Sequence, residues 1–290
     1  MQCIIAVLAT IFLLQTRPGF VQPVPASVPD VRMTCEAGRE SVRPGETFMI
    51  LCTLDIPRDF HVYWKSPGAS GTPTEFQVGG GANLQVGETL YPRPAMFDDE
   101  AGRTYGYEGR TQFLVPVTVP ADCPEGTVPI TVKGRWLACR KACWRGEATR
   151  GIEVVVSSDT TSDERPEISR AARCMPIPLS SMDGASISLD NSTLEIRGPI
   201  GRRGLPRLVP VEIPGVIHAD PRISRDGEDF LVRIPYRLEP ANSLGAEPRV
   251  EGLLLFGEER HDPSFAFSML IPPAERGAGG EDTSNRRNAP

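Results

Sequence analysis

The stretch RWLACRKACWR, residues 135–145, decides how the chain folds around it. It places two cysteines four positions apart, with a tryptophan outside each of them. An extended run, residues 128–132, precedes it, and another, residues 151–156, follows it. This pattern predicts a β-hairpin with residues 140–142 as its three-residue loop. Cys139 and Cys143 should then face each other at the mouth of the loop, with Cα atoms about 5.5 Å apart, within reach of a disulfide.

Positive charge surrounds the two cysteines, and Glu147 is the one carboxylate opposing it. The basic residues are Arg135, Arg140, Lys141, Arg145 and Arg150. Nearby positive charge favours the thiolate over the thiol, and the thiolate is the species that attacks a disulfide. The stretch therefore indicates a redox-active dithiol at Cys139 and Cys143. The alternative is an ordinary structural disulfide in a secreted domain.

The composition favours a globular protein built from strands. The chain has 290 residues, of which 40% are hydrophobic and 23% charged, enough for two domains. Its 28 glycines and 29 prolines interrupt helices and are scattered without a repeat, which favours short strands joined by turns. The formal net charge of −6 argues against a nucleic-acid-binding protein, because phosphate contacts need a basic surface.

Residues 1–26 are expected to be an export signal. Residues 4–14 are apolar except for Thr10, a length typical of a signal peptide and short for a membrane span. Small residues at 24–26 offer a cleavage site, although no lysine or arginine precedes the apolar run. The alternative is a buried or interfacial helix at the N-terminus. No later segment is long and apolar enough to cross a membrane.

Export changes what the cysteines imply. Without Cys3, six cysteines remain, and an even number outside the cytosol indicates disulfides whose pairing the sequence does not fix. Cys35 and Cys52 lie on neighbouring predicted strands and are candidates for a structural disulfide. Cys123 and Cys174 would be the remaining pair.

The spacing of strand and turn signals predicts an all-β protein with two immunoglobulin-like β-sandwiches. The first sandwich is expected over residues 27–157 and carries the cysteine pair. A linker and a short helix, the helix over 167–174, are expected within residues 158–175. A second, smaller sandwich should follow over residues 176–272, and residues 273–290 are polar, glycine-rich and expected to be disordered.

Individual strands are expected wherever short β-prone runs lie between turn residues. In the first sandwich these runs are 31–36, 47–54, 60–64 and 110–119, besides the hairpin. In the second they are 185–189, 193–197, 208–213, 230–236, 250–256 and 265–271. Residues 79–104 are expected to form a long irregular loop, which in a compact domain is usually functional or mobile.

Three motifs carry a family resemblance. FHVYWKSPG at 60–68, YGYEG at 105–109 and WLACRKAC at 136–143, in this order, resemble the amino-terminal periplasmic domain of the thiol:disulfide interchange protein DsbD and its ScsB-like relatives. VEGLLLF at 250–256 resembles the second β-domain of the ScsB-like branch. The resemblance covers most of the chain from about residue 30 to residue 272.

The resemblance implies an immunoglobulin-like sandwich located in the periplasm, whose cysteine pair is Cys139 and Cys143. In the family this pair receives electrons from a membrane-embedded DsbD-like domain and passes them to oxidised periplasmic proteins, with an aromatic loop that caps the pair until a partner docks. Tyr105 and Tyr107, with Phe97 as the alternative, are the cap candidates. The further supporting residues are Tyr63, the acidic Asp98, Asp99 and Glu100, and Trp136, Arg140, Lys141 and Trp144 beside the pair.

Two features depart from the best-known branch of the family. The spacing between Cys139 and Cys143 is shorter and fits the ScsB-like branch better. The sequence also lacks the membrane domain and the thioredoxin-like domain that often follow. The electron donor is therefore expected to be a separate protein; the alternative is that the cysteine pair does not cycle at all.

Dithiol–disulfide exchange, the activity of a protein-disulfide oxidoreductase without a cofactor, is the leading hypothesis. A second hypothesis is that the two thiolates hold a soft metal ion such as Cu(I). The spacing of His61, His218 and His261 does not mark them as ligands, and no metal site is predicted. A third hypothesis is a non-enzymatic interaction module stapled by three disulfides. The sequence does not show which cysteine attacks.

Overall fold

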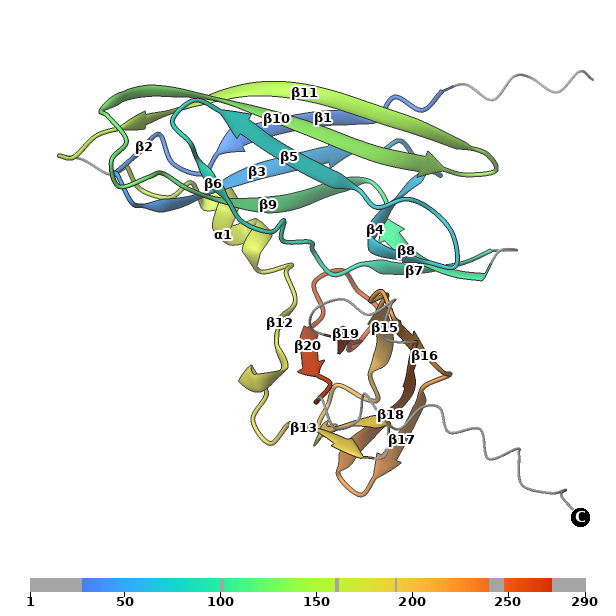
Figure 1. Ribbon diagram of the computed structural model, residues 1–290. Coiled ribbons are helices and arrows are strands. Elements are labelled where there is room, and N and C mark those ends of the chain that lie inside the picture. The colour runs from blue at the N-terminus through green and yellow to red at the C-terminus, as the bar shows by residue number, and fades with distance from the viewer. Residues whose placement is uncertain (1–27, 100–101, 160–161, 191, 240–247, 273–290) are drawn as a thin grey trace, which may run out of the picture.

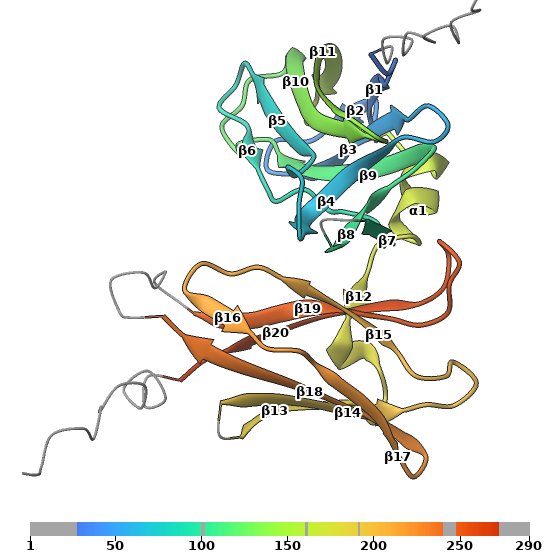
Figure 2. The same cartoon turned by 90° about the vertical axis from the view of Figure 1, so that its right-hand side faces the viewer.

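The computed structural model describes residues 28–99, 102–159, 162–190, 192–239 and 248–272, and it consists of two β-sandwiches (Figure 1). The expected export signal, with Cys3, lies outside these residues, as do Glu100 and the expected disordered tail. The chain crosses from one sandwich to the other through the helix α1 (Pro166–Ala172), which packs under the first sandwich (Figure 2). No helix in the described part of the chain is long and apolar enough to span a membrane.

The first sandwich contains two sheets. One has the strand order β1-β3-β9-β6, with β1 (Arg32–Ala37), β3 (Thr47–Asp55), β6 (Gln85–Val86) and β9 (Arg110–Thr118). The other has the order β2-β11-β10-β4-β8-β7, and β5 also pairs with β10. Its strands are β2 (Ser41–Val42), β4 (His61–Gly68), β5 (Glu75–Gly80), β7 (Ala95–Asp99), β8 (Gly102–Tyr107), β10 (Gly126–Cys139) and β11 (Cys143–Val156). The inner faces enclose a core that includes the fully buried Trp64 and Phe113.

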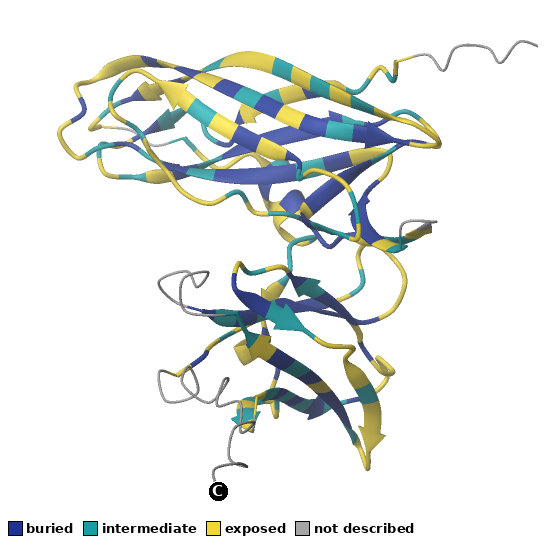
Figure 3. Cartoon of the chain, turned by 45° about the vertical axis from the view of Figure 1, so that its right-hand side comes forward, coloured by how far each residue is buried: buried dark blue, intermediate teal, exposed yellow. Residues whose placement is uncertain are grey.

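The strands β10 and β11 form one long ribbon, paired from Gly126↔Val156 to Cys139↔Cys143. Along β10, every second residue from Val128 to Ala138 is buried, because successive side chains of a strand point to opposite faces (Figure 3). The sequence predicted a hairpin with its loop at residues 140–142 but identified only residues 128–132 and 151–156 as extended runs. The pairing instead continues without interruption to the hairpin loop at residues 140–142.

A glycine lets the Trp136 indole lie across the ribbon. Gly146 is the register partner of Trp136, and a Cβ atom at Gly146 would lie 2.2 Å from Trp136 Nε1. We expect Gly146→Ala to displace the indole and lower the free energy of unfolding by about 1–3 kcal/mol, measured by urea denaturation. The matched control is Gly151→Ala on the same strand, where a Cβ meets nothing within 4 Å. Equal stability of the two variants would contradict the prediction.

The second sandwich follows α1 and again has two sheets. One has the order β12-β20-β19-β15, with β12 (Ile177–Pro178), β15 (Arg207–Val211), β19 (Arg249–Leu255) and β20 (Ser264–Leu270). The other has the order β13-β14-β18-β16, and β17 also pairs with β18. Its strands are β13 (Ser186–Asp190), β14 (Thr193–Pro199), β16 (Val216–His218), β17 (Arg222–Asp226) and β18 (Asp229–Leu238).

Three features differ from the sequence-based expectation. Residues 79–104, expected to be irregular, contain β6, β7 and the start of β8, because β7 and β8 pair as a hairpin. The strands β2, β5, β12, β16 and β17 were not predicted. The helix covers 166–172 instead of 167–174, and its buried Ile168 and Ala171 pack on Leu51 and Leu114.

Arg93 joins the two sandwiches. Its side chain is 4% exposed, and its guanidinium donates hydrogen bonds to carbonyl oxygens of the segment between β19 and β20. The two shortest of these hydrogen bonds, both 2.7 Å, are to the oxygens of Phe256 and Gly257. A longer bond, 3.1 Å, is to the oxygen of Pro263. Arg260 of the same segment donates to the carbonyl oxygen of Arg110. The β19–β20 segment is therefore held directly against the first sandwich.

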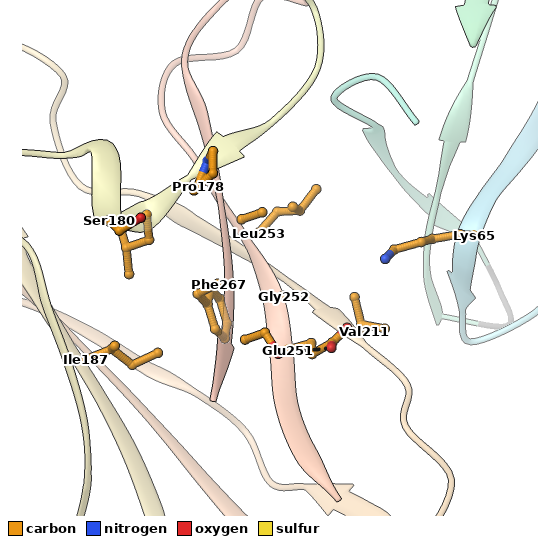
Figure 4. A pocket seen from close by; sticks show the side chains of 12 residues that line it. Lys65, Pro178, Ser180, Ile187, Val211, Glu251, Gly252, Leu253 and Phe267 are labelled. Atoms are coloured by element: carbon orange, nitrogen blue, oxygen red, sulfur yellow. Dashed lines mark hydrogen bonds between the residues drawn. The ribbon is translucent and has the colours of Figure 1, made fainter. Parts of the chain in front are cut away.

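A cleft of about 410 Å³ also lies between the sandwiches (Figure 4). Lys65 of β4 faces it from one side, and apolar side chains of the second sandwich, including Leu253 and Phe267, line the other. No cysteine or histidine lines this cleft. The chemistry expected from the sequence therefore lies elsewhere, at the tip of the β10–β11 ribbon.

Candidate functional site

The two cysteines of the hairpin are joined at the ribbon tip. Cys139 ends β10 and Cys143 begins β11, and their Sγ atoms are bonded at 1.99 Å with the Cα atoms 4.1 Å apart. The Arg140 amide donates to the carbonyl oxygen of Ala142 at 3.1 Å, which closes the loop. The predicted hairpin with its loop at residues 140–142 is confirmed.

The two sulfur-bearing residues differ in exposure. Cys139 is 3% exposed, whereas Cys143 is an exposed residue. The difference arises because β4 pairs with β10 beside Cys139, while Cys143 lies on the outer strand of the tip. A second protein can therefore approach the bond at Cys143, and Cys139 is shielded behind it.

His61 is the register partner of Cys139 on β4. Its imidazole stacks on the Phe97 ring with centroids 4.7 Å apart and planes at 18°. The Tyr63 ring meets it edge-on at 5.1 Å. His61, Phe97 and Tyr63 thus form an aromatic group beside the buried end of the disulfide, and of these the sequence analysis had not assigned His61 to the site.

Of the three predicted cap residues, Phe97 stacks on His61, the register partner of Cys139, whereas Tyr105 and Tyr107 are buried in the core. Tyr105 is 6% and Tyr107 3% exposed, and the Tyr107 hydroxyl donates to the carbonyl oxygen of Pro92 at 2.9 Å. Burial raises the pKa of both phenols. Both rings pack in the core of the first sandwich, Tyr105 on Trp64 and Tyr107 on Phe113, and the strand β8 that carries them lies next to the second sandwich (Figure 2).

The predicted acidic residues lie in the β7–β8 hairpin. Asp98 forms an ion pair with Arg103 at 2.8 Å, and hydrogen bonding to that guanidinium lowers the pKa of the carboxyl group. Asp99 ends β7 opposite Gly102, and Glu100 lies outside the described residues. Asp98 is therefore held by a cation of its own hairpin.

The basic residues divide into two groups according to their partners. Lys133 and Arg135 both contact Glu147, at 3.1 and 3.8 Å, and Arg150 donates to the carbonyl oxygen of Met33. Lys141 and Arg145 are exposed at the tip, and the Arg140 guanidinium lies 5.0 Å from the Phe60 ring centroid. The positive charge beside the disulfide therefore comes from residues 140, 141 and 145.

The two tryptophans support the tip from its inner side. Trp144 meets the Phe60 ring edge-on at 5.7 Å, and Trp136 is 6% exposed. Trp136 also borders a cleft of about 520 Å³ together with Arg135, Arg145 and Pro73. Both rings therefore hold the ribbon on the sandwich, and neither covers the sulfur of Cys143.

The other four cysteines of the described residues are thiols in this structure. Cys35 and Cys52 are direct register partners on β1 and β3, with Sγ atoms 3.6 Å apart. Cys123 and Cys174, expected as the remaining pair, have separate surroundings: the Cys123 thiol donates to the Pro124 carbonyl oxygen, and the Cys174 sulfur lies 3.3 Å from His261 Nδ1. Within the described residues, no group of three or more His, Cys, Asp or Glu side chains forms a possible metal site.

Known proteins support the same family. Residues 31–151 match the family described as thiol:disulfide interchange protein DsbD, N-terminal. This part of the chain is a DsbD N-terminal domain. The sequence motifs had suggested that family, and the match spans β1 to the middle of β11, including both cysteines of the tip.

Solved structures extend the likeness to the second sandwich. The N-terminal periplasmic domain of ScsB from Proteus mirabilis is 14% identical, with a TM-score of 0.59, over 86% of this chain and 96% of that one. At this identity the likeness concerns the fold alone. A protein of unknown function from Porphyromonas gingivalis W83 is 12% identical over 82% of this chain and 99% of that one, but its TM-score of 0.21 supports no argument. No curated protein matches the sequence.

Proposed function

We propose that this protein is an exported thiol:disulfide interchange protein that carries two electrons on the Cys139–Cys143 pair. One observation carries the proposal: a disulfide at a ribbon tip, with one exposed and one shielded cysteine, in a DsbD N-terminal domain. A disulfide that a partner can approach from one side suits exchange, because the attack needs access to one sulfur.

The proposed cycle has two halves. A thiolate of a donor protein attacks Cys143 Sγ, and Cys139 leaves as a thiolate; a second donor thiolate then releases the pair as a dithiol. In the other half, the Cys143 thiolate attacks a disulfide of an oxidised protein and expels one of its sulfurs. Cys139 then attacks Cys143 Sγ, which re-forms the intramolecular disulfide and releases the reduced protein. Each half moves two electrons between sulfur atoms and uses no cofactor.

The proposed partners follow from this cycle. A membrane-embedded DsbD-like protein would supply electrons, and periplasmic proteins with disulfides would receive them. We assign the redox domain to residues 27–157, the connection to 158–175 and a second domain to 176–272. The exposed Arg145 and Lys141 beside Cys143 favour the thiolate form of an attacking sulfur.

A redox titration tests the function. The mature protein is equilibrated in thiol–disulfide buffers of graded potential, alkylated, and analysed by mass spectrometry for Cys139 and Cys143. We expect a single two-electron transition at a potential above about −300 mV, since structural disulfides typically lie below that value. If the pair remains oxidised well below this potential, it is a structural disulfide, and the proposal fails.

We also propose that Cys35 and Cys52 close a structural disulfide when the protein is oxidised. They are direct register partners, their sulfurs are 3.6 Å apart, and hydrogen bonding between them lowers the pKa of Cys35 and raises that of Cys52. After oxidation by a small-molecule disulfide and unfolding, neither residue should react with an alkylating reagent, while Cys123 should react. Closing a loop of this length stabilises a fold by about 3 kcal/mol, so Cys35→Ser should lower stability by a similar amount. Full alkylation of Cys35 and Cys52 in the oxidised protein would contradict the pairing.

A further inference from the structure

We propose that His61 accepts and returns the proton of the Cys139 thiol during disulfide exchange, an inference that rests on the function proposed above. The two cysteines then have different roles. Cys143 meets the partner, and Cys139 exchanges its proton with a neighbouring imidazole.

The strand register puts His61 beside the buried sulfur. Cys143, Cys139 and His61 are opposite one another on the adjacent strands β11, β10 and β4. Residues directly opposite in an antiparallel pair project to the same face, with Cβ atoms about 4.5–5.5 Å apart. The three side chains therefore form one row in which the imidazole is next to Cys139 and Cys143 is on the far side.

Aromatic contacts hold the imidazole in this position. The Phe97 ring stacks on one face of it at 4.7 Å, and the Tyr63 ring meets it edge-on at 5.1 Å. Tyr63 is 2% exposed, and its ring lies directly under Gly71, where a Cβ would come within 2.5 Å of it. The His61 ring is thus fixed from β7 and from its own strand, with its orientation set before any partner arrives.

The buried thiol needs such a neighbour. Burial disfavours the thiolate, and solvent has little access to a residue that is 3% exposed. To re-form the disulfide, the Cys139 S–H bond breaks, its proton goes to the imidazole, and the sulfur attacks Cys143 Sγ while the partner sulfur leaves with its electron pair. When a partner opens the disulfide, Cys139 leaves as a thiolate and the imidazolium returns the proton.

Charged and titratable residues also lie on the strands around this site. They are Arg140, Lys141 and Arg145 of the ribbon, Lys65 of β4, Asp98 and Asp99 of β7, and Arg103, Tyr105, Tyr107 and Glu108 in and after β8. Arginine and lysine side chains ordinarily stay protonated near neutral pH and carboxylates ordinarily stay ionised, whereas an imidazole ordinarily exchanges its proton there. His61 is also the register partner of Cys139, so it combines the position with the chemistry.

The test follows the two steps separately in the reduced protein. The protein used has Cys35, Cys52, Cys123 and Cys174 replaced by serine, because these thiols would also react. Ellman's reagent, an aromatic disulfide, then releases one coloured thiolate when Cys143 attacks it and a second when Cys139 resolves the mixed disulfide. Stopped-flow traces between about pH 5 and 9 give both rates. In His61→Phe, which keeps a ring on Phe97, we expect the second step to slow about 100-fold at neutral pH and to lose the pH dependence that the imidazole gives it, with the first step changed less than about twofold.

Two further variants serve as controls for this result. His61→Gln tests a polar replacement in case the phenylalanine variant does not fold, as judged by circular dichroism, and it should show the same selective loss. His261→Gln, an exposed histidine of the second sandwich, should match the wild type. An unchanged second step in the His61 variants, or an equal slowing of both steps, overturns the proton-transfer role while exchange itself stands. A wild-type protein with no second release and no redox transition would overturn the proposed function instead.

Discussion

Cys139→Ser is expected to trap a partner protein as a stable mixed disulfide, whereas Cys143→Ser is expected to form none. The exposed Cys143 can still attack when Cys139 is a serine, but no internal sulfur then resolves the product. When Cys143 is a serine, the remaining sulfur is 3% exposed and out of a partner's reach. Both variants should lose turnover by at least about a thousandfold, measured as reduction of a disulfide-bonded protein by the reduced chain.

The matched control for these variants is Cys174→Ser. Cys174 is a partly exposed thiol that follows α1, and it contacts His261 instead of the ribbon tip. It should retain wild-type turnover and trap no partner. A Cys139→Ser, Cys143→Ser double variant that still reduced a protein disulfide would refute the assignment of the pair.

Arg93→Ala is expected to separate the two sandwiches and to lower stability by about 3 kcal/mol or more. The change removes a buried guanidinium and leaves the carbonyl oxygens of Phe256, Gly257 and Pro263 without this donor. Hydrogen bonds to a charged group contribute about 1.5–3 kcal/mol each, although the Gly257 oxygen keeps Arg207 as a donor and the Pro263 oxygen keeps the Phe256 amide. Urea denaturation of the whole chain should show a lower midpoint or a second transition. Tryptophan fluorescence follows the first sandwich, which contains all three tryptophans, and circular dichroism follows both sandwiches.

Arg207→Ala is the control for the Arg93 variant. Arg207 also donates to the Gly257 carbonyl oxygen, at 2.7 Å, but it is exposed. Its loss should change stability by less than about 0.5–1 kcal/mol, as is usual for exposed side chains. If both variants unfold like the wild type, Arg93 does not hold the sandwiches together.

Local patterns were enough to predict part of the fold. The hairpin follows from residues 135–145 alone, because its loop length and its cysteine spacing are both local. The longer strands β14, β18, β19 and β20 also coincide with predicted runs. The hairpin β7–β8 was missed because Pro92 and Pro94 precede it, and its pairing depends on β4, more than 25 residues earlier in the chain.

The candidate site was predictable only in its local parts. Tyr105 and Tyr107 were assigned as a cap from the sequence motif, but both rings are buried in the core of the first sandwich. His61 was set aside because its spacing marks no ligand, yet the register between β4 and β10 places it beside Cys139. Long-range pairing decides both outcomes, and a single sequence does not show it.

The Arg93 contact has a consequence for how the molecule responds to its surroundings. The acceptors in its hydrogen bonds are backbone carbonyl oxygens, which take up no proton as a solution turns acidic. An ion pair weakens when its carboxylate is protonated, whereas a hydrogen bond to a backbone carbonyl oxygen keeps its acceptor. We therefore expect the angle between the two halves of the molecule to persist through acid conditions that would open a conventional ion pair.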